Sequence, residues 1–222
     1  MTTTAIGVLA SAPLPGRCQR GLLAAHSPEW VAGLHAAMLR DTLDGLQAIE
    51  AAHHVMFVED ADAEALASLA RHVPAPWELV PLRSEERGAR LEEAFDTLLG
   101  RGVAYALLAA SEAPSAPTDE LAGATLDPAL REGLVVSPSE DGGFLALGTA
   151  RALPGVFADL PWETPALLDT LRLRCRERGI ELHALTPWYG VDAPCDVLRL
   201  IDELRSHPER APRTAQFLIT SG

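Results

Sequence analysis

The chain has 222 residues, of which 48% are apolar and 22% charged, a composition typical of a folded globular protein. Its formal net charge of −13 argues against a nucleic-acid surface and against docking on anionic lipid, because both attract basic patches. The three cysteines form no CxxC pair, which argues against a disulfide framework or a zinc site and favours a reducing cytoplasm.

No window approaches the ~20 apolar residues of a membrane helix, and the N-terminus lacks the basic region of a signal peptide. We therefore expect a single cytoplasmic domain over residues 1–222, with neither nucleic acid nor membrane as a partner. The sequence leaves the oligomeric state open, including a homodimer.

Apolar periodicity and turn residues divide the chain into alternating strands and helices. In chain order the expected elements are a strand at 5–10, a helix at 27–46, a strand at 53–60, a helix at 62–73, a strand at 77–82, a helix at 85–102, a strand at 103–110, a helix at 118–125, strands at 133–138 and 144–148, a helix at 166–179, a strand at 180–185 and a helix at 195–207. Ser27-Pro28 and Thr164-Pro165 carry the N-cap-plus-proline signature of a helix start. The tail either packs through Phe217 and Leu218 or frays.

This alternation predicts the α/β class, with a mostly parallel sheet covered by helices on both faces. In such sheets, ligands bind outside the carboxyl ends of the strands. We therefore expect the functional residues in the loops that follow strands or precede helices at this edge. Four such loops carry motifs with a chemical interpretation.

The first loop, "SAPLPGRCQRG", follows the first strand. Its proline and glycine residues can bring backbone N–H groups to a phosphate or a base, and Arg17 and Arg20 add positive charge to an acidic chain. The alternative is a stiff connector with solvated arginines. The pattern matches neither the phosphate-binding P-loop nor the dinucleotide fingerprint.

The second loop places Glu112 directly after the most apolar strand, "VAYALLAA". An acid at the carboxyl end of a buried parallel strand is well placed to hold Mg²⁺ or Mn²⁺. The alternative is a loop acid that caps the next helix.

The third loop is Glu140-Asp141-Gly142-Gly143, between two apolar runs. Its carboxylates could bind a metal, a sugar hydroxyl or an acceptor, while the glycines leave room for substrate. The alternative is a hairpin turn, which Asp141-Gly142 alone would explain. Glu140 and Gly143 exceed what such a turn requires, which favours the functional interpretation.

The fourth loop contains Asp192, just before the last expected helix, as Asp192-Ala193-Pro194. Asp192 could bind a metal or a substrate. It is also an ordinary N-cap for this helix, and the two roles are compatible because a carboxylate has two oxygens.

Several stretches together resemble a known family: "APLPGR" (12–17), "RGARLEEAF" (87–95), "SPSEDGGFLALG" (137–148), "LPWETPALLDTL" (160–171) and "WYGVDAPCDVLRLIDEL" (188–204). They are similar to small glycosyltransferase-like proteins associated with radical-SAM and selenium-domain genes, long described as a domain of unknown function. The resemblance implies a Rossmann-like, three-layer α/β/α fold of the GT-A type found in nucleotide-diphospho-sugar transferases. It also implies an enzyme that acts on a nucleotide-activated sugar or a nucleotide and on a small-molecule acceptor, usually with Mg²⁺ or Mn²⁺.

The resemblance divides the single domain into a nucleotide-binding part at roughly 1–115, an acceptor or sugar part at roughly 116–206 and a tail at 207–222. The residues implied for nucleotide binding are Ala10, Pro13, Gly16, Arg17, Arg20 and Arg90. Those implied for the sugar or acceptor are Glu140, Gly142, Gly143 and Trp162. Asp141 and Asp192 are implied in catalysis, and Glu112 and Asp192 in metal binding.

The chain also departs from the family pattern. Gln19-Arg20-Gly21-Leu22 stands where the family shows Lys-Thr-Arg-Leu, and Glu112 stands where it shows Asp. Two hypotheses follow: a divergent but active glycosyl- or nucleotidyltransferase, or an impaired relative that binds a nucleotide or a partner protein without turnover. A structural or adaptor protein is a third, which would need an exposed apolar patch.

Overall fold

The structure is a computed structural model that describes residues 3–59 and 61–221. Seven strands form one sheet in the order β3-β2-β1-β4-β6-β5-β7. The strands are β1 (Thr4–Ala10), β2 (His53–Val58), β3 (Glu78–Pro81), β4 (Tyr105–Ala110), β5 (Leu134–Pro138), β6 (Phe144–Thr149) and β7 (Leu182–Ala184). Only β6 runs antiparallel to its neighbours among these strands, so the predicted mostly parallel sheet is confirmed.

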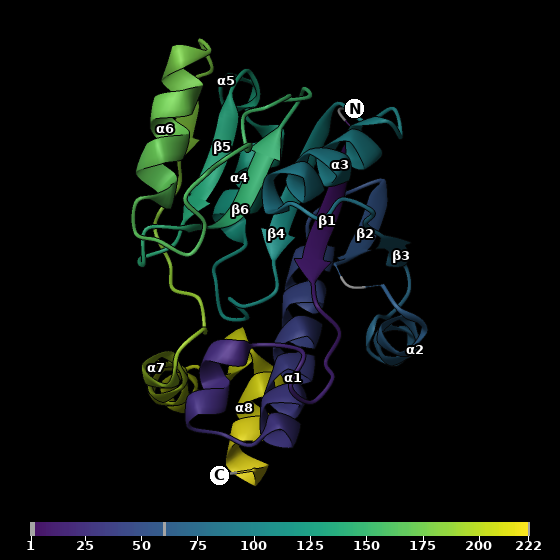
Figure 1. Cartoon of the computed structure of the whole chain (residues 1–222), viewed down its shortest axis with the longest axis vertical. Coiled ribbons are helices and arrows are strands. Elements are labelled where there is room, and N and C mark those ends of the chain that lie inside the picture. Colours follow the sequence, from purple (N-terminus) through teal and green to yellow (C-terminus); the bar gives the residue numbers. More distant parts are fainter. Residues whose placement is uncertain (1–2, 60, 222) are drawn as a thin grey trace.

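The helices are η1 (Arg20–Ala24), α1 (Pro28–Gln47), α2 (Ala63–His72), α3 (Arg87–Leu99), α4 (Asp119–Leu126), α5 (Pro128–Arg131), α6 (Leu167–Glu177), α7 (Pro194–Ser206), η2 (Pro208–Arg210) and α8 (Pro212–Thr220). The helices α3 and α6 pack on one face of the sheet, while α1, α2 and α4 pack on the other (Figure 1). This arrangement confirms the predicted three-layer α/β/α architecture. Within the described part of the chain, no helix combines the length and apolarity needed to cross a membrane.

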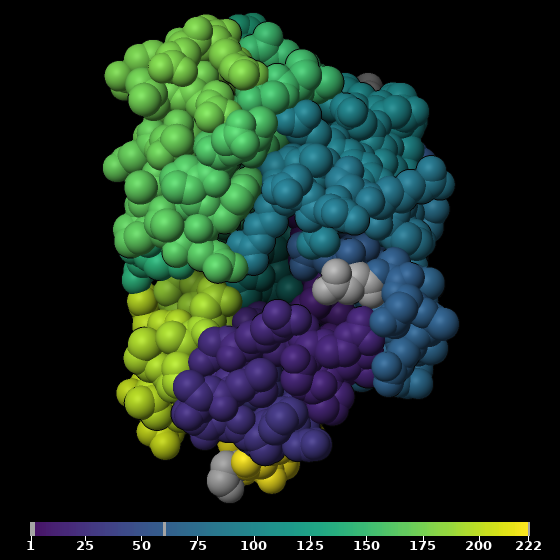
Figure 2. Space-filling model, in the orientation of Figure 1, coloured from purple at the N-terminus to yellow at the C-terminus, as the bar shows by residue number. Residues whose placement is uncertain are grey.

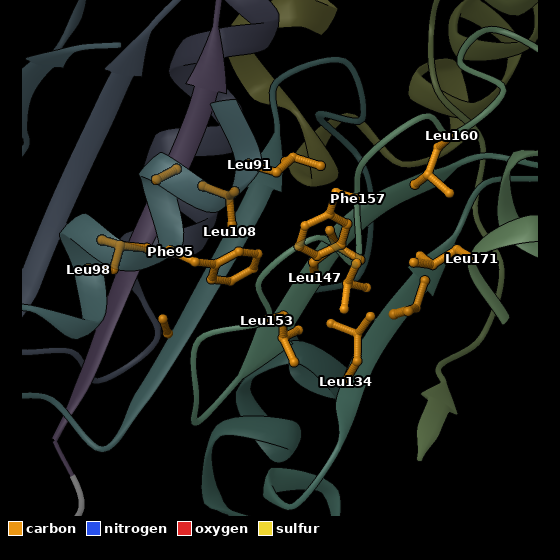
Figure 3. Packing of buried hydrophobic residues seen from close by; sticks show 14 of the residues in the cluster. Leu91, Phe95, Leu98, Leu108, Leu134, Leu147, Leu153, Phe157, Leu160 and Leu171 are labelled. Carbon is orange, nitrogen blue, oxygen red and sulfur yellow. The ribbon is translucent and has the colours of Figure 1, made fainter. Parts of the chain in front are cut away.

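The core on the α3 and α6 face is rich in leucines and includes the rings of Phe95 and Phe157 (Figure 3). The rings of Phe95 and Phe157 stack with their centroids 6.0 Å apart. Phe157 lies in the segment between β6 and α6, which returns over the sheet to reach α3. The approach is close at Gly88, where a Cβ atom would lie 2.1 Å from the Phe157 carbonyl oxygen. Glycine is therefore required there by packing.

A third cluster of buried residues lies at the carboxyl edge of the sheet, where η1, α7, α8 and the first half of α1 pack together (Figure 1). The tail packs rather than frays, because Phe217 contacts the ring of Trp30 at 5.6 Å between centroids. Asp41, buried in α1, accepts hydrogen bonds from the Thr214 N–H at 2.8 Å and the Thr214 hydroxyl at 2.7 Å. These contacts fix the helices that border the carboxyl ends of the strands.

Local start signals were right at one helix and wrong at another. The Ser27 hydroxyl accepts a hydrogen bond from the Trp30 N–H at 3.2 Å and so caps α1 as predicted. Thr164, in contrast, donates to the Pro161 carbonyl, and α6 begins at Leu167 without a side-chain cap. The strand expected at 53–60 ends at Val58, and Asp60 lies outside the described residues.

Candidate functional site

Three of the predicted acids meet at the carboxyl edge of the sheet. Glu112 follows β4, and its carbonyl oxygen accepts a hydrogen bond from the Val191 N–H at 2.9 Å. A Cβ atom on Gly190 would lie 3.1 Å from Asp192 Oδ2 and 3.4 Å from Glu112 Cγ. The two carboxylate side chains therefore flank the same glycine, although they are 80 positions apart in the sequence. Figure 2 shows this side of the molecule hollowed between the purple N-terminal segment and the blue and green segments.

Burial and neighbouring negative charges together raise the pKa values of Glu112 and Asp192. Burial, followed by the charges of Asp192 and Glu59, raises the pKa of Glu112 to about 8. Burial, followed by the charge of Asp141 and then that of Asp196, raises the pKa of Asp192 to about 6. The Asp192 residue as a whole is exposed to solvent, which screens its charge. A site with this charge favours a cation.

Asp192 does not cap the helix that follows it. The N-cap residue of α7 is Ala193, and the carboxylate of Asp196 accepts hydrogen bonds from the Ala193 N–H at 2.8 Å and the Asp192 N–H at 3.1 Å. Asp196 therefore satisfies the free N–H groups at this helix start. The interpretation of Asp192 as the N-cap was wrong, and its carboxylate is left to face Glu112.

Asp141 lies in the turn between β5 and β6 and takes part in it. Its Oδ1 accepts a hydrogen bond from the Gly143 N–H at 3.0 Å. Gly142 has a φ of +95°, and a Cβ atom on it would lie 2.3 Å from the Pro165 carbonyl oxygen. Backbone conformation and packing thus already require Gly142. The turn interpretation and the catalytic prediction for Asp141 are compatible, because the turn uses one of its two carboxylate oxygens.

Two residues predicted to contact the sugar or acceptor have protein partners. Glu140 forms a bidentate ion pair with Arg199 of α7, with N–O distances of 2.5 and 3.0 Å. The Arg199 guanidinium lies 3.8 Å from the ring centroid of Tyr189. Trp162 is half-buried and packs its ring against Phe144, with centroids 6.1 Å apart. Their predicted roles in substrate binding remain predictions.

The loop after β1 brings only some of its predicted nucleotide-binding residues to the acids. Ala10 and Pro13 are buried, and Gly16 is exposed with a φ of +75°. Arg17 forms an ion pair with Asp62 at 2.7 Å, at the start of α2. Its charge is therefore already balanced by that helix start.

Arg20 is exposed beside the acid group, whereas Arg90 contacts other residues of the protein. Arg20 is exposed at the start of η1, next to Gly21, where a Cβ atom would lie 2.2 Å from the Asp192 carbonyl oxygen. The start of η1 is thereby held directly against the acid group. Arg90 donates to the Ser84 carbonyl at 2.9 Å and lies 3.6 Å from a carboxylate oxygen of Glu59.

Arg87 is a cation of this site that sequence reasoning missed. It begins α3 and forms an ion pair with Glu163 at 2.6 Å, with both side chains largely exposed. Its charge lowers the pKa of Asp192, opposing the stronger effects of burial and of Asp141. In the sequence, Arg87 is one of several charged residues in an expected helix. Only the spatial proximity to Asp192 distinguishes it.

The residues present fit a divalent cation that shares its coordination with a substrate. The described residues contain no group of three or more His, Cys, Asp or Glu side chains arranged to hold a metal alone. Mg²⁺, however, is commonly bound by one or two carboxylates, with the remaining positions filled by waters and substrate phosphates. Glu112 and Asp192 supply such a pair.

Comparison with solved structures defines the class of fold: the chain has a nucleotide-diphospho-sugar transferase-like fold. A Desulfovibrio desulfuricans G20 protein named a "putative nucleotide-diphospho-sugar transferase" matches with a TM-score of 0.88 and 21% identity, covering 99% of this chain and 95% of that one. The chain belongs to the family described as "Uncharacterized protein conserved in bacteria (DUF2064)", whose sequence model matches residues 42–164. No curated protein matches it.

Two more distant structures share the fold. CMP:2-keto-3-deoxy-manno-octonic acid synthetase in complex with CTP has a TM-score of 0.59 and 12% identity, covering 93% of this chain and all of that one. Rv0371c from Mycobacterium tuberculosis H37Rv in complex with manganese has a TM-score of 0.56 and 15% identity, covering 91% and 99% of the two chains. At these identities the likeness concerns the fold alone.

Proposed function

We propose that this protein is a metal-dependent glycosyl- or nucleotidyltransferase that acts on a nucleotide-activated sugar or a nucleotide. The observation that carries the proposal is the convergence of Glu112, Asp192 and Asp141 at the carboxyl edge of a mostly parallel sheet. This edge is where α/β sheets bind their ligands. An acid pair with raised pKa values is costly to the fold, which is typical of functional sites.

In this proposal Glu112 and Asp192 hold Mg²⁺ or Mn²⁺. When bound, the cation would neutralise the acid pair and attract the phosphates of the nucleotide. Arg87 and Arg20 lie at the edges of the site and supply positive charge to the same phosphates. The close approach of Gly21 to the Asp192 backbone keeps the η1 start in place during binding.

Asp141 is the proposed general base in this scheme. Its charge acts on Asp192, so it lies beside the metal pair, and it is itself exposed to an incoming acceptor. One oxygen is held by the Gly143 N–H, which orients the carboxylate, and the other can accept the proton of an acceptor hydroxyl. The acceptor itself is proposed only as a small molecule with a hydroxyl or similar nucleophile.

Relatives of the fold support the ligand class. The synthetase with 12% identity was solved with CTP, and Rv0371c was solved with manganese. Both ligands match what the acid pair and the neighbouring arginines could hold. The base, the sugar and the division into nucleotide and acceptor parts remain proposals for this chain.

A second candidate function is nucleotide binding without turnover. The observation that favours it is that Arg17 and Arg90, both predicted to contact nucleotide, already lie against carboxylates of Asp62 and Glu59. Cations committed to the protein contribute less to a phosphate in the transition state. The two candidates agree on binding and differ on catalysis.

A thermal-shift and turnover experiment tests both candidates. UDP-, GDP- and dTDP-sugars and CTP are each added with and without Mn²⁺, and the melting temperature is compared. A ligand at a hundredfold its Kd stabilises the folded state by ~2.7 kcal/mol. A shift that requires both nucleotide and Mn²⁺, accompanied by release of nucleotide product, supports the transferase. A shift without product supports the second candidate. No Mn²⁺-dependent shift with any nucleotide contradicts the transferase, and no shift with any nucleotide, with or without Mn²⁺, contradicts both.

A further inference from the structure

A cavity of about 160 Å³ lies on the other face of the sheet from α3 and α6. Its walls come from α1, the strands β4 to β6, the segment before α4 and the segment before α7, and they include Thr42, Ala109, Leu121, Ser137, Ala146 and Trp188. Ala109 and Ala146 belong to the core shared with α1 and α4, whereas Ala106 of β4 belongs to the core on the α3 face. The cavity therefore opens on the α1 and α4 face of the sheet, and Ala110 and Ala113, on either side of Glu112 in the chain, contribute to its wall.

The cavity exists because small residues line it. Gly45 of α1, Ala109 of β4, Ala146 of β6 and both Ala113 and Ala116 contribute to its walls. Protein interiors normally pack like organic crystals, with few voids larger than a water molecule. A cavity of roughly 150 Å³ with apolar walls is large enough to hold a benzene ring. The space is thus suited to a compact apolar group.

The charged residues at the cavity wall already have partners within the protein. Asp41 accepts from Thr214, and Glu120 accepts from the Thr186 N–H at 2.8 Å and its hydroxyl at 2.6 Å. Arg210 forms an ion pair with Glu203 at 2.9 Å. The donors to Asp41 and Glu120 are uncharged N–H and hydroxyl groups, so both carboxylates keep their negative charge. A negatively charged ligand is therefore disfavoured at this wall.

One polar anchor is available. Ser137, on β5, is partly exposed, and within the described residues no hydrogen bond involves its hydroxyl. The Thr42 hydroxyl lies nearby in the wall with a long contact of 3.5 Å to the Ser111 carbonyl. A few placed polar groups in a mostly apolar pocket are typical of small-molecule sites.

We propose that this cavity is a binding site for a small molecule without negative charge that has a ring-sized apolar body and one hydroxyl group. Its binding can be tested without nucleotide or metal. Benzyl alcohol is the probe, and benzoate is its negatively charged counterpart. Binding is measured by ligand-observed NMR and by thermal shift.

The expected result is that benzyl alcohol binds the wild-type chain, whereas benzoate does not. Ala109→Leu fills the cavity, so binding is lost while the melting temperature is kept or raised. Ala146→Leu is a second filling variant with the same expected loss of binding. The matched control is Ala106→Leu, three positions earlier on the same strand and in the closed core, which keeps binding but lowers the melting temperature.

Three results would overturn the proposal. They are no binding of benzyl alcohol to the wild type, equal binding of benzoate, and unchanged binding to both Ala109→Leu and Ala146→Leu. A fall in the melting temperature of Ala109→Leu as large as that of Ala106→Leu would also show that the space is closed in solution. None of these outcomes depends on whether the chain is a transferase.

Discussion

The carboxylates of Glu112 and Asp192 lie on either side of Gly190, where each raises the energy of ionising the other. Neither forms an ion pair with a cationic side chain in the described part of the chain. Like charges held close together oppose folding, and a ligand cation would relieve this. Because of this proximity, we expect the stability of the protein to depend on pH and on divalent metal.

Replacing Glu112 is expected to stabilise the apoprotein at alkaline pH. The folded-state pKa is raised from the ordinary 4.5 to about 8, so between these values the folded state binds more protons than the unfolded state. The free energy of unfolding is therefore highest below the ordinary pKa of Glu112, and it falls as pH rises through the folded-state pKa. Glu112→Gln should add about 2 kcal/mol at pH 9, discounted for partial exposure, and little at pH 4. Urea unfolding at both pH values measures this, and a destabilised variant at pH 9 would contradict it.

Metal affinity should rise with pH, because Mn²⁺ competes with protons for Glu112 and Asp192. Between pH 5.5 and 8.5 we expect the apparent Kd for Mn²⁺ to fall steadily, as measured by calorimetry. Asp192→Asn should weaken Mn²⁺ binding by about tenfold or more. Asp169→Asn is the control, since Asp169 lies on α6 and pairs with Arg172. Equal affinities for the two variants would remove Asp192 from the metal site.

Asp141→Asn should abolish turnover and leave the melting temperature nearly unchanged. An asparagine oxygen can still accept the Gly143 N–H, so the turn is kept while the basic carboxylate is lost. Turnover is measured as product formation from whichever nucleotide stabilises the wild type. A large loss of stability with normal turnover in the remaining folded protein would assign Asp141 to the turn alone.

The ion pair between Glu140 and Arg199 should contribute modestly to stability. Both side chains are about half exposed, so Glu140→Gln is expected to cost roughly 0.5–1 kcal/mol and to do so less at high salt. Arg199→Gln should have the same effect, and the double variant should cost no more than either single one. If Glu140→Gln instead raises the KM for an acceptor without changing stability, the predicted contact with substrate is favoured.

Arg87→Gln should weaken nucleotide binding and reduce its salt dependence. The guanidinium lies at the edge of the acid group and forms an ion pair with exposed Glu163, which a phosphate could replace. We expect an increase of about tenfold in the Kd for the nucleotide. The control is Arg172→Gln, which removes an equally exposed arginine on α6. Unchanged affinity for Arg87→Gln would exclude this cation from the site.

The sequence predicted the fold well because the governing patterns are local. Alternating apolar runs and helical periodicity specified the parallel sheet, and Ser27-Pro28 specified the start of α1. The rule that ligands bind at the carboxyl ends of parallel strands selected Glu112 in advance. These inferences need only the order of residues along the chain.

The remaining features depend on long-range contacts. Arg17 pairs with Asp62 and Arg87 approaches Asp192, and neither partner can be chosen from spacing in the sequence. The helix expected at 166–179 is α6, Leu167–Glu177, but the expected cap is absent, since Thr164 bonds a carbonyl instead of the helix. The packing of α8 on α1 likewise rests on Asp41 and Thr214, far apart in the chain.

A single aspartate often both caps a helix and binds a ligand. Here Asp196 accepts the hydrogen bonds at the start of α7, so the two roles fall to different residues. Because the helix is secured by Asp196, its neighbour Asp192 can be exchanged without unwinding that helix. A loss of activity on changing Asp192 would then reflect the loss of its carboxylate from the proposed site. A loss of activity on changing Asp196 would reflect a disturbed start of α7, which positions that site.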